Sequence, residues 1–329
     1  ETEYYTYNEQ TSNLGVGWTW AFPSVETRGN QQYFHFADGS VYAVGSGGQG
    51  LVDYPLKDVT FAPSTEILRT KNAAGTEVTA QAAYALTDTL GTGVYFNSNG
   101  QWIGTKDAYG NVIMVLYAKQ PVNDQNEYPL IDRIIDTLNR EITFTYTSNS
   151  VTVTYAPGQS LVYNKRLISN TNKKRELASV VNENGETTSY TYDKNEVKFD
   201  YDTSSQPDAG QTLYNDLEQI TYPTGGRTTY EYTTASKRLG DTGTLEYSRV
   251  ARRYDELRES TYKKKNVVVF DYSRMTDFND PAQESSVIKR TTISNPNDPS
   301  HITAVEKISE TTQLNADHLP VQFTREKAG

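Results

Sequence analysis

Large apolar residues alternate with small polar ones at a period of two along much of the chain. Ile142, Phe144 and Tyr146 alternate with threonines, and Val151 and Val153 repeat the pattern directly afterwards. β-branched and aromatic residues at this spacing place the large side chains on one face of a strand. The pattern predicts an all-β fold in which antiparallel hairpins form a continuous strip.

Turn signals separate these runs. Asn-Gly and Asp-Gly pairs favour tight hairpins because their residues tolerate a positive φ. Five glycines are predicted to lie in the turns of repeated hairpins: Gly39, Gly100, Gly110, Gly185 and Gly225.

Two stretches are ambiguous. Leu130–Leu138 has helical spacing, but residues 136–140 resemble a turn before the clear strands of Ile142–Tyr155, so a strand is favoured there. Val250–Leu257 suits a helix or a strand equally. Pro121–Tyr128 is expected to be a long loop.

A degenerate repeat underlies the pattern. Leu177–Asp193 and Leu217–Tyr232 each comprise a strand, a glycine turn, a threonine-containing stretch and a Tyr-x-Tyr sequence. Leu130–Tyr146 and Trp102–Tyr117 are looser copies. A single hairpin of this kind cannot bury its apolar face, so neighbouring copies must stack into one sheet.

Composition changes the expected core. Hydrophobic residues make up 36% of the 329 residues, and this share includes 25 tyrosines. We therefore expect burial to rest largely on Tyr and Val. The longest apolar run, Val112–Ala118, is far shorter than the roughly 20 residues that cross a bilayer as a helix.

Charge and cysteine content exclude several functions. The net charge of −10 disfavours nucleic acid and anionic membranes as partners. The absence of cysteine excludes disulfides, thiolate metal sites and a thiol nucleophile. An acidic chain rich in Tyr, Thr, Asn and Gly fits an exported bacterial protein, and its repeat-like ends suggest a segment of a longer one.

The repeats resemble those of the YD-repeat (Rhs) family. The Gly-x-Gly-Trp segment at Gly15–Glu26 looks like the opening of family shells. Further stretches also resemble the family's N-terminal region: Phe34–Tyr42, Tyr54–Val59 and Val94–Ile103.

This resemblance implies a long antiparallel strip that coils into a hollow shell around a C-terminal toxin. The chain is much shorter than a complete shell. It also lacks the family's self-cleavage motif of the Asp-Pro-x-Gly type, because Asp280-Pro281 and Asp298-Pro299 continue differently.

Chemical motifs are few. Gly45–Gly50 matches a dinucleotide fingerprint, but the early Pro55 replaces the helix that such a site needs. The three histidines, His35, His301 and His318, lack ligand-like spacing. No cofactor and no catalytic set are indicated.

Two kinds of site remain conceivable. Acidic loops such as Asp277–Asp280 and Asn123–Glu127 offer oxygen atoms to a cation, although a solvated turn is the simpler interpretation. Trp18, Trp20 and Trp102 could stack on sugars. Trp18 and Trp20 would share one face of a strand, and packing is again the simpler interpretation.

The favoured hypothesis is a non-enzymatic wall segment of a secreted or cell-wall-associated YD-repeat shell. Its partners would be the rest of that shell and an enclosed effector. We expect one continuous strip over 1–329, with an opening part (1–105), repeat hairpins (106–235) and degenerate repeats (236–329). The alternative is a carbohydrate-binding surface adhesin.

An incomplete sheet leaves unpaired strand edges that recruit other chains. The sequence therefore predicts self-association through the edge near Val321–Phe323.

Overall fold

The structure is a computed structural model that confirms the all-β, antiparallel fold class. It describes residues 12–122, 126–168, 175–193, 199–201, 216–239, 243–258, 262–274, 286–294, 306–314 and 320–328. A 3-10 turn at Ser46–Gly48 (η1) lies in the glycine-rich loop. In the described part no helix is long and apolar enough to cross a membrane.

The chain divides into two compact units, residues 1–185 and 186–329. Whether one sheet runs through the whole chain, with the three parts expected from the sequence, stays a prediction.

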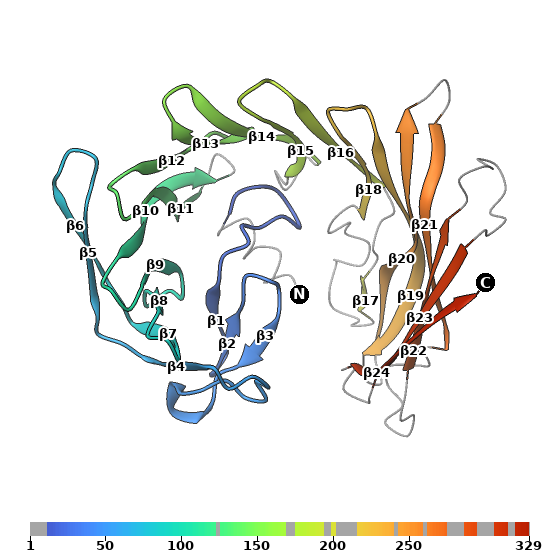
Figure 1. The fold of residues 1–329 in the computed structure, drawn as a ribbon, viewed down its shortest axis with the longest axis horizontal. Coiled ribbons are helices and arrows are strands. Elements are labelled where there is room, and N and C mark those ends of the chain that lie inside the picture. The colour runs from blue at the N-terminus through green and yellow to red at the C-terminus, as the bar shows by residue number, and fades with distance from the viewer. Residues whose placement is uncertain are drawn as a thin grey trace. The chain divides into compact units, whose positions relative to one another are not determined.

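Unit 1 is built on an antiparallel strip in which most strands pair with their neighbours in sequence (Figure 1). Its strands, in spatial order, are β4 (Val59–Pro63), β7 (Tyr84–Asp88), β8 (Gly93–Phe96), β9 (Trp102–Lys106), β10 (Val112–Val122), β11 (Asn126–Ile135), β12 (Glu141–Tyr146), β13 (Ser150–Ala156), β14 (Gln159–Leu167) and β15 (Arg175–Val181).

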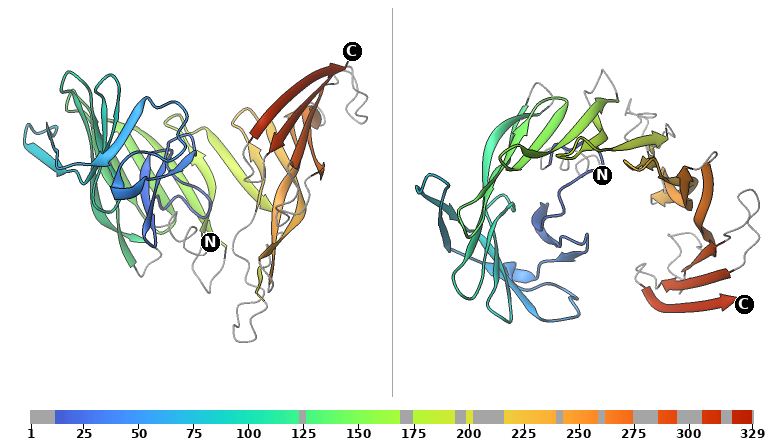
Figure 2. Two further views of the ribbon diagram at one scale, coloured as in Figure 1. Left: turned by 90° about the horizontal axis from the view of Figure 1, so that it is seen from below. Right: turned by 45° about the horizontal axis from the view of Figure 1, so that its top comes forward.

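Further layers cover both faces of this strip. A small sheet of β1 (Ser24–Arg28), β2 (Gln31–His35) and β3 (Val41–Ala43) lies on the concave face, and the hairpin of β5 (Ile67–Lys71) and β6 (Glu77–Gln81) lies on the convex face (Figures 1 and 2). Consequently β10 is buried on both sides: Val115 packs into the concave cluster and Met114 into the convex one. This explains why Val112–Ala118 is uninterruptedly apolar.

Unit 2 is also an antiparallel arrangement in which most described strands pair with their neighbours in sequence. Its strands are β16 (Thr187–Asp193), β18 (Asp216–Thr221), β19 (Arg227–Leu239), β20 (Gly243–Arg258), β21 (Tyr262–Arg274), β22 (Ser286–Ser294), β23 (Glu306–Leu314) and β24 (Pro320–Ala328), with β17 (Phe199–Tyr201) paired to the start of β20.

One turn design recurs at the hairpins. In the turn 107–111, Asp107 Oδ1 accepts hydrogen bonds from the N–H groups of Tyr109 (2.9 Å) and Asn111 (2.8 Å), while Gly110 adopts a φ of +89°. Asp136 makes the same two bonds in its turn, where Asn139 takes the left-handed position at φ +62°. The five predicted turn glycines all lie in hairpin turns with positive φ, which confirms that prediction.

Three of these hairpins are each braced by a tyrosine of their own. Each phenolic O–H donates to a main-chain carbonyl oxygen fifteen residues earlier, on the opposite strand of its own hairpin. The pairs are Tyr117 with Trp102 (2.8 Å), Tyr146 with Ile131 (2.8 Å) and Tyr232 with Leu217 (2.7 Å). The braced hairpins coincide with three of the repeats recognised in the sequence.

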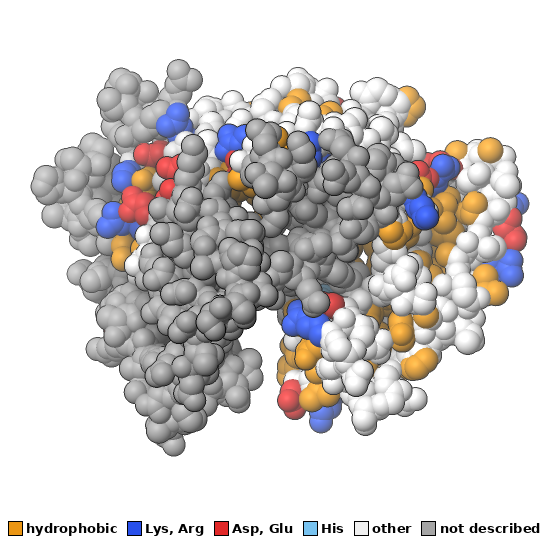
Figure 3. Space-filling view, turned by 180° about the vertical axis from the view of Figure 1, so that it is seen from behind, with side chains coloured by type: hydrophobic (Ala, Val, Ile, Leu, Met, Phe, Trp, Pro, Cys, Tyr) orange, Lys and Arg blue, Asp and Glu red, His pale blue; other side chains and the backbone are white. Residues whose placement is uncertain are grey.

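The expectation that burial rests largely on Tyr and Val is right for Val and wrong for Tyr, because Tyr146 and Tyr254 are the only buried tyrosines among the described residues. The fully buried side chains are mainly Val, Leu, Ile and Phe, among them Phe34, Phe61 and Phe96. Most described tyrosines are half-buried, because the ring packs against the sheet while the hydroxyl reaches a polar partner. On the face of unit 1 seen in Figure 3, apolar side chains also lie exposed between charged ones.

Both helical alternatives resolve as strands, β11 and β20. The loop expected at Pro121–Tyr128 is wrong, because β10 and β11 continue as a two-stranded ribbon in which Pro121 pairs with Glu127. β9 pairs with β10 only over Val112–Met114, so Pro121 lies beyond that pairing, where its missing N–H is tolerated.

We expect Tyr146→Phe to lower the free energy of unfolding by about 1–2 kcal/mol, because it removes a buried hydrogen bond to Ile131. Burial raises the pKa of Tyr146 above its ordinary value. The folded state therefore favours the neutral phenol, so this stabilisation is complete below about pH 10 and is lost as the pH rises further. Urea unfolding from pH 7 to 11 should show a shallower alkaline decline in the variant. Tyr109→Phe is the control, because Tyr109 is 92% exposed.

Candidate functional site

The three tryptophans gather around one end of the concave face of unit 1. Trp18 and Trp20 belong to the arm, defined as residues 12–22, which precedes β1. The prediction that they lie on a strand is wrong: the arm is irregular, and a turn closes where the Trp18 N–H donates to the Gly15 carbonyl oxygen (3.1 Å). Trp102 is the first residue of β9.

The ring of Trp20 is packed against three other aromatic rings. Phe144 and Tyr163 meet its ring edge-on, with centroids 5.5 and 5.3 Å away, and Phe22 stacks at 6.4 Å. Phe22 continues the cluster to Trp102 at 5.0 Å. Edge-on and offset contacts of this kind stabilise a core. The arrangement therefore fixes the arm on the strip.

A small cavity of about 60 Å³ lies beside this cluster, with Trp20, Phe22, Trp102, Tyr117 and Gln101 in its wall. For scale, a cavity of about 150 Å³ accommodates benzene, and ligand pockets usually exceed about 300 Å³. This partly open hollow thus suits a few water molecules or the tip of a larger group.

Carbohydrate binding by Trp18, Trp20 and Trp102 stays a prediction. Because these are the only tryptophans in the chain, intrinsic fluorescence reports on this region alone. Stacking on a sugar should shift the emission when a methyl glycoside is added. An unchanged spectrum across neutral, amino and acidic glycosides would argue against the adhesin alternative.

The N-terminal end of the arm makes a buried polar contact with the strip. Lys165 Nζ donates to Asn13 Oδ1 (2.8 Å), and both residues are about 95% buried. The Val16 N–H donates to the Arg175 carbonyl oxygen (2.8 Å). Gly15 has a φ of +110°, and a Cβ there would lie 2.8 Å from the Leu177 nitrogen. The Gly-x-Gly-Trp opening therefore begins with glycine because the main chain of β15 lies directly against it.

A second backbone junction holds the small concave sheet. The Val25 N–H donates to the carbonyl oxygen of Gly100 (2.8 Å) in the β8–β9 turn. Val25 and Phe34 then pack on Phe61 and Phe96 of the strip. The arm and the small sheet thus form a single lining that covers the concave face.

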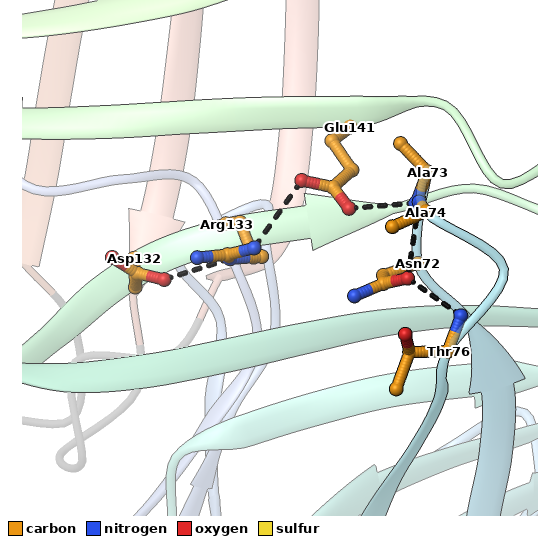
Figure 4. Close-up of polar contacts among 7 residues, drawn as sticks. All are labelled: Asn72, Ala73, Ala74, Thr76, Asp132, Arg133 and Glu141. Atoms are coloured by element: carbon orange, nitrogen blue, oxygen red, sulfur yellow. Dashed lines mark hydrogen bonds and ion pairs between the residues drawn. The ribbon is translucent and has the colours of Figure 1, made fainter.

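The convex hairpin is held by a clasp (Figure 4). Glu141 accepts a hydrogen bond from the Ala73 N–H (2.8 Å) through one carboxylate oxygen. Its other carboxylate oxygen forms an ion pair with Arg133 (3.3 Å). Asn72 closes the turn by accepting from the Ala74 and Thr76 N–H groups. The clasp connects the hairpin tip to the β11–β12 hairpin.

Two other candidates from the sequence, His35 and the glycine-rich loop, have structural surroundings and not those of a ligand site. His35 Nε2 lies 2.8 Å from Glu26 Oε2, and the same carboxylate also forms an ion pair with Arg28. For Glu26, burial opposes ionisation, but the hydrogen bonds and charges of Arg28 and His35 outweigh it and hold the pKa below its ordinary value. The loop at Gly45–Gly50 is followed by no helix, so the dinucleotide interpretation stays excluded.

Several candidates cannot be placed. Asp277–Asp280, His301 and His318 lie outside the described residues, as does most of the loop at 123–127. Among the residues the structure does describe, no group of three or more His, Asp or Glu is arranged to hold a metal ion.

The sequence analysis missed the residues that attach the lining, above all Asn13, Lys165 and Glu141. No periodicity marks them, because each acts on a partner distant in sequence. The first residue of each turn was detectable, since Asp or Asn precedes the turn glycine by three positions in several hairpins.

Comparison with known proteins adds little. No family model matches the chain, and no curated protein matches it. Among solved structures it is similar to the crystal structure of TcdB2-TccC3-TEV, with 10% identity and a TM-score of 0.20. The match covers 92% of this chain and 19% of that one, so this chain spans about a fifth of its length. A similarity at this level carries no argument about function.

Proposed function

We propose that this chain is a structural, non-enzymatic wall segment of a YD-repeat-type β-shell. The observation that carries the proposal is the braced hairpin. Tyr117, Tyr146 and Tyr232 each fix a hairpin through a carbonyl fifteen residues away. Because the brace lies inside each hairpin, neighbouring units can be added side by side into an extended wall.

The lining of unit 1 supports a wall role. The arm and β1–β3 cover the concave face through backbone junctions at Gly15 and Gly100, and the clasp at Glu141 fixes the convex hairpin. Where both layers cover the strip, as at β10, the sheet is closed to solvent on both faces. These properties suit a container better than a ligand-binding surface.

The rest of the proposal comes from the sequence. The chain would belong to an exported bacterial protein whose wall encloses or presents a C-terminal toxin or effector. The wall itself would carry no catalytic residues and no cofactor. Its partners would be the rest of the shell and the enclosed polypeptide.

The decisive experiment identifies the native protein. An antibody against this chain would capture it from its source, followed by intact mass measurement and peptide mapping. We expect a much longer polypeptide accompanied by a separate C-terminal piece that resists added protease until the wall is unfolded. A protein that ends close to Gly329, or one whose C-terminal region is freely digested, would contradict the shell.

A further inference from the structure

The four most exposed large apolar side chains in the described residues lie in loops and turns of unit 1. They are Leu56 (71%), Leu90 (81%), Tyr109 (92%) and Leu138 (69%). The other exposed large apolar side chains in the described residues have exposed fractions of 38% to 62%.

These residues follow one another along a single edge of the strip, here called the apolar rim. The Thr89 N–H donates to the Asp58 carbonyl oxygen (3.1 Å), which places the loop of Leu56 beside the turn of Leu90. A Cβ on Gly91 would lie 3.6 Å from the Ala108 Cβ, so the Leu90 and Tyr109 turns touch. The Leu138 turn comes next, because Ile135 pairs with Met114.

The turn design does not require apolar tips. Leu90, Tyr109 and Leu138 each occupy the third position of a five-residue turn. At the same position the chain has Asn99 in the 97–101 turn and Asn184 in the 182–186 turn. Three apolar tips on successive hairpins of one edge therefore indicate a surface that is covered by something else.

We propose that the apolar rim is a contact surface for a second copy of this chain, packed rim to rim about a two-fold axis. Successive hairpin tips are about 10 Å apart, because adjacent strands are separated by about 4.8 Å. A second copy necessarily carries the same spacing, so the tips of one rim fit between those of the other. A two-fold contact uses the same patch on both copies.

The available area suits a weak, reversible dimer. On each copy Tyr109 can bury about 200 Å² and the three leucines roughly 100 Å² each. The two copies together therefore bury about 1,000 Å², which is near the area that a specific interface needs. This proposal does not depend on the shell function.

The charge of the chain predicts how salt affects the dimer. Each of the three turns starts with an aspartate, and the chain carries a net charge of −10. The side chain of Asn111 holds the pKa of Asp107 below its ordinary value, so this carboxylate stays ionised at neutral pH. Arg140 pairs with Asp136 in its own turn, but each copy carries a net charge of −10, so two copies in contact repel one another electrostatically. Salt should strengthen the dimer by screening this repulsion, whereas it would weaken binding to a basic partner.

Sedimentation velocity of the full chain over a range of protein concentrations, at low and high salt, tests the proposal. We expect a reversible monomer–dimer equilibrium that tightens with salt. The double substitution Leu90→Asn, Tyr109→Asn uses the residue that the chain itself places at this position, and it should weaken association about tenfold or more. Phe323→Asn is the matched control, because Phe323 is also exposed (62%) but lies on β24.

Each alternative outcome overturns the proposal. Monomers under all conditions would exclude it. Dimers that persist in the double variant and vanish with Phe323→Asn would assign association to the β24 edge. Tip-dependent binding to phosphatidylcholine vesicles without dimers would make the rim a membrane contact.

Discussion

Gly100→Ala is expected to detach the small β1–β3 sheet from the strip. A Cβ at this position would lie 1.8 Å from the Val25 carbonyl oxygen, and the residue has a φ of +74°. The left-handed conformation costs a non-glycine residue about 1–2 kcal/mol, and forced displacement of packed neighbours costs about 1–3 kcal/mol. The free energy of unfolding should therefore fall by about 2–5 kcal/mol, measured by urea denaturation.

Gly110→Ala separates the two causes. Gly110 has a similar φ of +89° in the same turn design, but no atom lies within 4 Å of the position that an added methyl group would occupy. Its replacement should cost only about 1–2 kcal/mol. In addition, limited proteolysis should cut residues 24–44 faster in the Gly100 variant alone. Equal losses and equal digestion in both variants would refute the role of Gly100 as the junction.

Lys165→Met is expected to release the arm from the strip. The substitution keeps the length of the side chain but removes the donor to Asn13 Oδ1, in a contact where both residues are almost fully buried. The Asn13 Nδ2 group already lacks a hydrogen-bond partner in the described part of the chain. A buried amide left without its donor costs about 1–3 kcal/mol. Trp18 and Trp20 belong to the arm, so their emission should shift to longer wavelength.

A double-mutant cycle with Asn13→Gly isolates this contact. Asn13 has a φ of +53°, which glycine adopts without strain. The double variant should lose less stability than the sum of the two single variants. Lys106→Met is the control, because its ion pair with Glu66 is partly exposed (38% for each side chain) and should contribute less than about 1 kcal/mol. If Lys165→Met behaves like Lys106→Met, the contact does not hold the arm.

The features that sequence analysis predicted correctly are local. Gly185 and Gly225 could be recognised because a turn needs a left-handed residue at a fixed place. The alternation at Ile142–Tyr146 correctly predicted that Ile142, Phe144 and Tyr146 share one face, and all three pack in the same cluster. Each of these inferences depends on residues a few positions apart, which is the range over which sequence patterns are informative.

The features it missed depend on distant contacts. Asn13 and Lys165 are separated by 152 positions, and nothing near either residue indicates the other. Trp18 and Trp20 were assigned to a strand because their spacing fits one, yet Gly15 must turn the chain there to approach β15. Pro121 suggested a loop, but the ribbon of β10 and β11 extends past their neighbouring strands and accommodates it.

The fifteen-residue brace limits how such a chain can vary. Tyr146 reaches the Ile131 carbonyl oxygen only if the strands and turn between them keep their length. Inserting one residue would also turn every following side chain to the opposite face. Duplicating or deleting a whole hairpin preserves both the brace and the facing of the side chains. The strip should therefore change size by complete hairpins, so that a gene encoding it can vary the length of the wall without redesigning its core.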